Sequence, residues 1–99
     1  MDVLRQKEVE RLFQAILTLQ TVEECYRFFE EACTIKEIQE IAQRFDVASQ
    51  LWTGKSYQEV NQKTGASTAT ICRVKKCLMY GSSGYQLVLK RMAEEEEHG

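Results

Sequence analysis

Three capping boxes constrain the fold of this chain more than any other feature of its sequence. In each, a Ser or Thr is followed three residues later by Glu, so that the hydroxyl and the carboxylate satisfy two backbone amides at the start of a helix. The pairs are Thr21 with Glu24, Thr34 with Glu37 and Ser56 with Glu59. Apolar residues recur at helical spacing behind them, and the chain contains no proline. The sequence therefore predicts helices that start near residues 21, 34 and 56, the second of them running to about residue 53.

Two further helices are predicted at the ends of the chain. Asp2 can cap a first helix that runs to about Leu19. Its recurring apolar residues are Val9, Leu12, Phe13, Ile16 and Leu17. A last helix, over residues 84–96, follows a short turn rich in Gly and Ser. Counting the short helix described next, the sequence predicts six helices, no strand and an all-α fold.

Gly65 joins two short helical patterns within residues 56–80, as in a helix-turn-helix. Gly65 ends the first pattern because the left-handed conformation is strongly disfavoured for residues with a Cβ. Ser67 offers a second N-cap only two residues later. The chain is therefore expected to turn sharply into another helix.

The helix after Ser67 is predicted to have one apolar face and one cationic face. At about 100° per residue, one stripe must pack inward, made of Ile71, Val74 and Leu78. The opposite face carries Ala69, Arg73, Lys76 and Tyr80. Short side chains over residues 68–70 would let the helix N-terminus approach base edges of DNA, and three cations, Arg73, Lys75 and Lys76, can reach phosphates or guanine. The same spacing also fits an ordinary helical hairpin with solvated lysines.

Charge is segregated along the chain. The net charge is −2, but residues 53–93 carry seven Lys/Arg and one Asp/Glu, whereas residues 1–52 carry six and ten. A local basic face attracts a polyanion whatever the total charge. The glutamates at 94–97 are expected to form a solvated, frayed helix end.

The chain is too short to cover all of its apolar residues. A single domain of 99 residues buries only about 60 to 65% of the surface of its unfolded chain, so association stabilises it. The first three helices carry more than one apolar stripe, with Phe13, Leu17, Phe28, Phe45 and Trp52 among the bulky residues. Residues 1–53 are therefore expected to be the dimerisation core. The alternative is that the last helix folds back and buries these residues within one chain.

The sequence offers no metal site, membrane span or catalytic set. The cysteines at 25, 33, 72 and 77 form no Cys-x-x-Cys pair, and the only histidine is in the polar tail at 98. Buried reduced thiols are expected, with Cys25 and Cys33 on apolar-rich helices. Neither a Ser/His/Asp nor a Cys/His set can be assembled, so no enzyme is predicted. No apolar run approaches the ~20 residues of a membrane span, and a cytoplasmic protein is expected.

Residues 65–73, Gly-Ala-Ser-Thr-Ala-Thr-Ile-Cys-Arg, resemble the DNA-reading segment of the tryptophan repressor, as do the preceding residues 51–56, Leu-Trp-Thr-Gly-Lys-Ser. Within that superfamily the chain resembles the small proteins of the YerC/YecD type, most sharply over residues 34–78. The resemblance implies a homodimer in which the first three helices of each subunit interlace and the helix-turn-helix units project as heads. Two recognition helices roughly 34 Å apart would bind a palindromic operator in double-stranded DNA.

The residue pattern and the resemblance together define candidate site residues. The predicted DNA-binding residues are Ser56, Gln58, Ser67, Thr68, Ala69, Thr70, Arg73, Lys75 and Lys76. In the tryptophan repressor a threonine and two arginines line the pocket of an amino-acid effector, and the matching residues here are Thr34, Arg44 and Arg73. Guanidinium groups can clamp a carboxylate, so a ligand bound there would fix the angle of the head against the core.

Four residues depart from the family pattern. Val74 stands where the repressor has a glycine beside the indole ring, and Glu31 replaces an apolar leucine. The pocket is therefore expected to be closed or retuned, and L-tryptophan is not the expected effector. Asn61 lies at a tight helix crossing where alanine is usual, and Thr64 where an apolar residue is usual. They would cost about 1 to 2 kcal/mol of packing unless Asn61 finds a hydrogen bond, or they signal a mobile head.

These observations predict a sequence-specific transcriptional regulator that binds DNA as a homodimer and represses by occlusion. No metal or cofactor is expected, and an effector would be an amino-acid-like molecule. The alternative is a helical dimeric interaction module whose basic head docks an acidic protein partner. Discrimination between DNA sequences separates the two.

Overall fold

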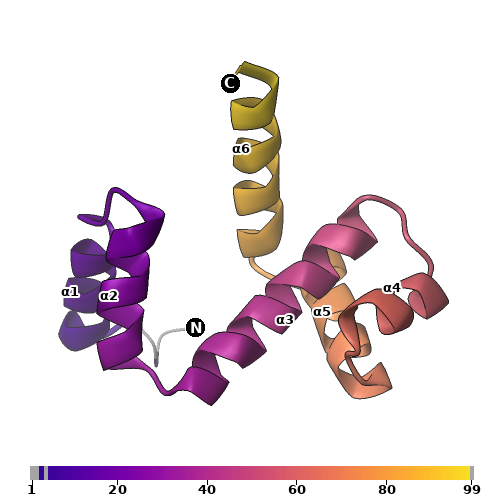
Figure 1. Ribbon diagram of the computed structural model, residues 1–99, viewed down its shortest axis with the longest axis horizontal. Helices are drawn as coiled ribbons and strands as arrows, with labels where there is room; N and C mark the ends of the chain where they lie inside the picture. The colour runs from indigo at the N-terminus through magenta and orange to yellow at the C-terminus, as the bar shows by residue number, and fades with distance from the viewer. Residues whose placement is uncertain (1–2, 4, 99) are drawn as a thin grey trace. The chain divides into compact units, whose positions relative to one another are not determined.

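Six α-helices and no strand make up the part of the chain that the computed structural model describes, residue 3 and residues 5–98 (Figure 1). The helices are α1 (Lys7–Ile16), α2 (Val22–Ala32), α3 (Ile35–Trp52), α4 (Tyr57–Thr64), α5 (Thr68–Tyr80) and α6 (Gly84–His98). The predicted all-α fold is confirmed. The chain forms two compact units, Met1–Ile38 and Gln39–Gly99, so the boundary falls within α3.

The predicted caps start α2 and α3. The Thr34 hydroxyl accepts a hydrogen bond from the Glu37 amide at 3.1 Å, and the Glu37 carboxylate accepts one from the Thr34 amide at 2.8 Å. Thr21 accepts from the Glu24 amide at 3.0 Å, but the Glu24 carboxylate accepts from the amide of Gln20, one residue earlier than expected, at 2.9 Å. Both helices therefore begin where the sequence predicts.

The prediction for the first helix is wrong at its start. The helix begins at Lys7, with Gln6 at its N-cap and no side-chain capping bond, and it ends at Ile16. The expected cap, Asp2, lies outside the described residues. The apolar repeat begins only at Val9, so the helix extends just two residues ahead of the segment that can pack.

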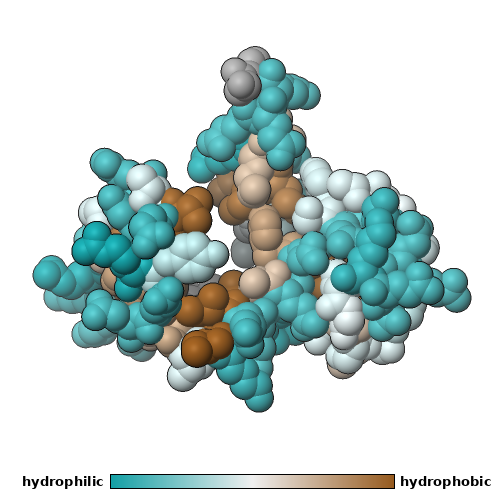
Figure 2. Space-filling view, viewed as in Figure 1, coloured by the Kyte–Doolittle hydropathy of each residue, from teal (hydrophilic) through white to brown (hydrophobic). Residues whose placement is uncertain are grey.

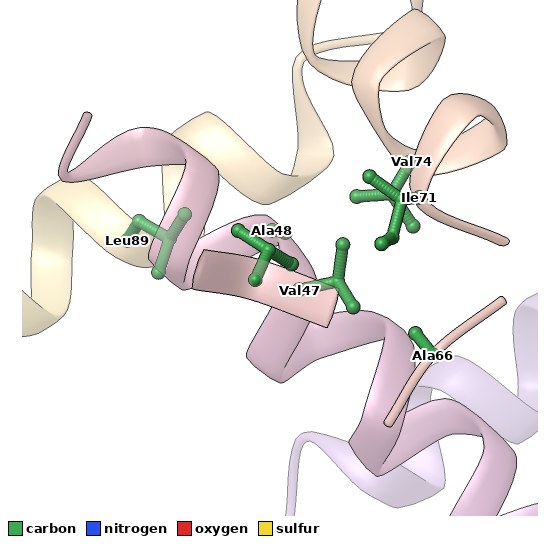
Figure 3. Close-up of a cluster of buried hydrophobic side chains, with 7 residues drawn as sticks. Val47, Ala48, Ala66, Ile71, Val74 and Leu89 are labelled. Atoms are coloured by element: carbon green, nitrogen blue, oxygen red, sulfur yellow. The ribbon is translucent and has the colours of Figure 1, made fainter. Parts of the chain in front are cut away.

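The second unit contains a core to which four helices and a turn contribute. Its buried residues are Val47 and Ala48 of α3, Val60 of α4, Ala66 of the turn between α4 and α5, Ile71 and Val74 of α5, and Leu89 of α6. Figure 3 shows Ile71 and Val74 on the side of α5 that faces the Val47 and Ala48 segment of α3. Side chains at the edge of this core are half-buried, among them Phe45, Leu51, Leu78 and Tyr85. The core fixes α4 and α5 on the C-terminal half of α3.

The helices of the first unit contain no buried residue. Neither α1 nor α2 buries a side chain, and Phe13, Leu17 and Tyr26 are 57%, 83% and 60% exposed. Figure 2 shows hydrophobic side chains at the surface of the chain. The alternative, in which the last helix buries these residues, is not seen in the core: the buried residue of α6, Leu89, packs with α3, α4 and α5.

The expectation of buried thiols is also wrong for the single chain. Cys25, Cys72 and Cys77 are exposed and Cys33 is half-buried. Cys25 is exposed because α2 buries no side chain, and the other two exposed thiols lie on α5 away from its packed stripe. Within the described residues, no group of three or more His, Cys, Asp or Glu could hold a metal ion. None of the described helices has the length and apolar character to cross a membrane.

Candidate nucleic-acid interface

A complete capping box starts α4. The Ser56 hydroxyl accepts a hydrogen bond from the Glu59 amide, and the Glu59 carboxylate accepts one from the Ser56 amide, both at 3.2 Å. The Ser56 amide, and to a smaller extent its hydroxyl, lower the pKa of Glu59, and the positive charges of Lys55 and Lys63 act in the same direction. Glu59 is thereby kept ionised at the helix N-terminus, where a negative charge stabilises the helix dipole.

Gly65 makes the predicted hinge between α4 and α5. Its backbone is left-handed, with φ of 70° and ψ of 8°, and its amide donates to the Asn61 carbonyl at 3.0 Å. Ser67 is the N-cap of α5, and its hydroxyl accepts from the Thr70 amide at 3.2 Å. We call residues 56–80, which comprise α4, this turn and α5, the head. The head is the helix-turn-helix that the sequence predicts.

Asn61 and Thr64 stabilise the turn of the head. The Asn61 amide group donates to the Ala66 carbonyl at 2.9 Å. The Thr64 hydroxyl donates to the Val60 carbonyl at 2.7 Å and accepts from the Ala66 amide at 3.1 Å. Asn61 thus has the hydrogen bond that offsets its packing cost. The two residues that depart from the family pattern, Asn61 and Thr64, both stabilise the turn by hydrogen bonds.

The two faces of α5 lie as predicted. Ile71 and Val74 are buried and Leu78 is half-buried, so the inward stripe packs on the core. Every charged residue of α5 is exposed, namely Arg73, Lys75 and Lys76. Tyr80 is also exposed, at the end of the same helix. Since α5 has no acidic residue, the only charges on its free surface are positive, and they lie in the middle of the helix.

The first turn of α5 presents short polar side chains. Ser67, Thr68 and Ala69 are exposed and Thr70 is half-buried. The Ser67 hydroxyl donates to the Thr70 hydroxyl at 3.1 Å, so the Ser67 proton is used within the cap. The Thr70 hydroxyl can still donate its own proton to another acceptor. A small, hydroxyl-lined helix end of this kind fits between the edges of a DNA groove.

One contact between the two helix N-termini could not be read from sequence. The Tyr57 hydroxyl, in the first turn of α4, is hydrogen-bonded to the Thr68 hydroxyl, in the first turn of α5. Ser56 and Gln58, both exposed, flank Tyr57 along the chain. The contact therefore joins the first turn of α4 to the first turn of α5. No local pattern signals it, because the two residues are eleven apart and meet only through the turn.

The residues matched to the effector pocket are divided between the two units. Thr34 belongs to the first unit, where its hydroxyl caps α3. Arg44 is half-buried on α3, and Arg73 is exposed on α5. Val74 is only 1% exposed, because its side chain is part of the core. Glu31, the other departure, is exposed on α2.

These features define a small all-helical protein with a helix-turn-helix head and an exposed cationic helix. The family model described as Trp repressor protein matches residues 7–93, so the chain belongs to the Trp repressor family. It is 54% identical over 95 residues to the uncharacterized protein YerC of Bacillus subtilis (strain 168), which covers 96% of this chain and 91% of that protein. The predicted likeness to YerC-type proteins is confirmed.

Two crystal structures resemble this chain closely. A TrpR-like protein from Eubacterium eligens ATCC 27750 has a TM-score of 0.91 and 48% identity, over 94% of this chain and 96% of that chain. A candidate Trp repressor from Staphylococcus aureus has a TM-score of 0.90 and 47% identity, over 93% and 92%. The Trp-repressor-like fold thus extends over nearly all of the chain.

Proposed function

We propose that this protein is a sequence-specific, DNA-binding transcriptional regulator of the cytoplasm, which represses as a homodimer by occluding its operator. The observation that carries the proposal is the cationic, outward surface of α5 behind a capped N-terminus and a left-handed glycine hinge. A helix presented in this way can enter the major groove, where its first residues contact base edges. Membership of the Trp repressor family supports the same function.

The residues of the head divide into two groups in this proposal. Ala69, Thr70 and Arg73 contact bases, since a methyl group can pack on thymine and a guanidinium can bind guanine. The residues that position phosphates are Ser56, Gln58, Lys75 and Lys76, while Ser67 and Thr68 form the capped start of α5 between them. The first group sets sequence preference, and the second supplies affinity that falls with salt.

The exposed apolar residues of α1 and α2 support a homodimer. Phe13 of α1, Leu17 at its C-cap, and Val22 and Tyr26 of α2 are all more than half exposed. A helix of this kind gains most of its stability from packing an apolar face. A second copy of the chain would cover these residues and would bring a second head. Two heads about one helical turn apart, roughly 34 Å, would bind a palindromic operator.

The burial of Val74 argues against L-tryptophan as an effector in this proposal. A glycine at this position would leave room beside Arg73, but the valine side chain is packed among the core residues. We therefore expect DNA binding without L-tryptophan. An effector of this protein would be an amino-acid-like molecule smaller than L-tryptophan.

Selection of operators from random duplex DNA tests the proposal. The wild-type protein should enrich a palindrome with half-sites one helical turn apart, with or without an amino-acid mixture. Arg73→Ala should weaken binding to the selected operator by about tenfold to a hundredfold. Arg91→Ala, at an exposed arginine of α6, is the matched control and should bind normally. Salt-dependent binding without any sequence preference would contradict the proposal and favour a head that docks an acidic protein.

A further inference from the structure

A side chain of α3 holds the end of α4. The Gln43 amide group donates to the Thr64 carbonyl at 3.2 Å, across 21 positions of the chain and at a partly buried site. Thr64 is the last residue of α4, so its carbonyl has no acceptor role within the helix. Gln43 therefore satisfies a backbone group that helix α4 leaves open.

With this bond, four polar backbone groups at the turn have hydrogen-bond partners. The Gly65 amide bonds to the Asn61 carbonyl, and the Ala66 amide bonds to the Thr64 hydroxyl. The Ala66 carbonyl accepts from Asn61, and the Thr64 carbonyl accepts from Gln43. Three of these four bonds require a particular side chain. The conformation of the turn is thus specified by polar contacts and not only by Gly65.

The bond from Gln43 differs in kind from the apolar contacts beside it. Gln43 lies one helical turn before Val47, so the polar and apolar contacts share one side of α3. Apolar burial has no preferred direction, and a packed core alone tolerates small rotations of a helix. A hydrogen bond weakens steeply with misalignment. The bond from Gln43 can therefore fix the angle between α3 and the turn, from which α5 begins three residues later.

We propose that Gln43 is a positioning residue, which sets the angle of α5 on α3 and thereby the match of the recognition helix to one DNA sequence over others. The proposal rests on the proposed function, because it concerns how the same head discriminates between sequences. Gln43 acts through the Thr64 carbonyl and the turn, while α5 makes the contacts with bases. A small tilt displaces base-contacting side chains from their hydrogen-bonding positions but leaves phosphate attraction nearly unchanged.

The first test compares Gln43→Leu with wild type. Leucine keeps the apolar part of the side chain and removes the donor. The ratio of operator affinity to non-specific affinity should fall about tenfold, while non-specific affinity and its salt dependence stay unchanged. Gln39→Leu, at an exposed glutamine one turn earlier on α3, is the matched control and should keep the wild-type ratio. An unchanged ratio in Gln43→Leu would overturn the proposal.

The second test uses Gln43→Glu to restore the bond by protonation. Above the carboxyl pKa of about 4.3, the new side chain has no proton to donate to the Thr64 carbonyl. Below it, the carboxylic acid can donate one. The affinity ratio of Gln43→Glu, relative to wild type at the same pH, should therefore be low at pH 7 and recover as the pH falls towards 4, whereas Gln43→Leu should not recover. Equal behaviour of the two variants would contradict a role for the donor.

Hydrogen exchange without DNA separates this proposal from the proposed function. At neutral pH the Ala66 amide should exchange about tenfold faster in Gln43→Leu and Gln43→Glu than in wild type or Gln39→Leu. Faster exchange in a protein that selects no operator would show that Gln43 holds the turn and that the proposed function fails. Unchanged exchange would overturn the positioning role even if the wild-type protein selects an operator.

Discussion

The two units of the chain differ in how their apolar side chains are used. All buried apolar residues of the described chain lie between residues 47 and 89, in the second unit. In the first unit α1 and α2 bury nothing, although their apolar residues recur with helical period. The second unit therefore has a core of its own, whereas the helices of the first unit present apolar side chains at their surface.

This difference indicates which helices have a core of their own and which need further packing to be stable. Helices as short as α1 and α2 are marginally stable in water on their own, because helix nucleation is unfavourable. Most of their stability must come from packing of the apolar face. The proposed homodimer supplies that packing to the first unit. The head would depend on the partner for the spacing of two recognition helices and not for its own core.

The largest expected effect is on the association of the first unit. Phe13→Asp puts a charge on the α1 residue that is 57% exposed in the single chain and buried in the proposed dimer. Burying an unpaired charge costs several kcal/mol, and a symmetric dimer carries two, so the dimer dissociation constant should rise by at least about a hundredfold. Sedimentation equilibrium measures it. Gln14→Asp, at the exposed polar neighbour of Phe13, is the control. Equal association of both variants would show that the apolar face of α1 is not an interface.

Local sequence was sufficient to predict the caps and the hinge. A capping box joins residues three apart, and the conformation of Gly65 depends on its own backbone, so no knowledge of the rest of the fold is needed. The inward and outward faces of α5 follow from helical period in the same way. For these reasons Ser56, Ser67, Gly65, Val74 and Arg73 lie as the sequence predicts.

Contacts between distant segments could not be predicted. The bond from Gln43 to Thr64 and the bond from Tyr57 to Thr68 join residues that meet only once α3, α4 and α5 are packed. The sequence marks Asn61 as a departure from the family pattern, but its acceptor, the Ala66 carbonyl, depends on the shape of the turn. The apolar residues of α2 predict that Cys25 is buried, but α2 has no buried residue and Cys25 is exposed.

A smaller effect, on the free energy of unfolding, is expected from a substitution at Gly65, the hinge of the second unit. Gly65→Ala introduces a Cβ that meets no atom within 4 Å, so its cost arises from the left-handed backbone alone, at about 1 to 2 kcal/mol of unfolding free energy. Gly84→Ala, also in open space but without a positive φ, should be neutral or stabilising by up to about 1 kcal/mol. Urea unfolding of both variants measures the difference. Equal stabilities would mean that the turn does not need the left-handed conformation.

The smallest expected effect is on the pH dependence of stability. It should be the same in both units, because it arises from the local caps of their helices. Hydrogen bonds from the Thr34 amide to Glu37 and from the Ser56 amide to Glu59 lower the pKa of each carboxyl in the folded chain. A lowered folded pKa stabilises the fold above the ordinary value of about 4.5, and this stabilisation is lost as the pH falls through the folded pKa.

Glu37→Gln and Glu59→Gln keep an acceptor for the capping amide but cannot ionise. Each variant should be slightly less stable than wild type at pH 6, and the gap should close as the pH falls below about 4.5 in thermal melts. A gap that stays constant with pH would show that the charge of the cap contributes nothing. If the stability difference closes for Glu59→Gln but not for Glu37→Gln, the two units differ in their helix caps as well as in their side-chain packing. If the stability difference closes equally for both variants, the two units differ only in side-chain packing. That is the expected result, since each cap forms within a few residues of chain whether or not a core lies behind it.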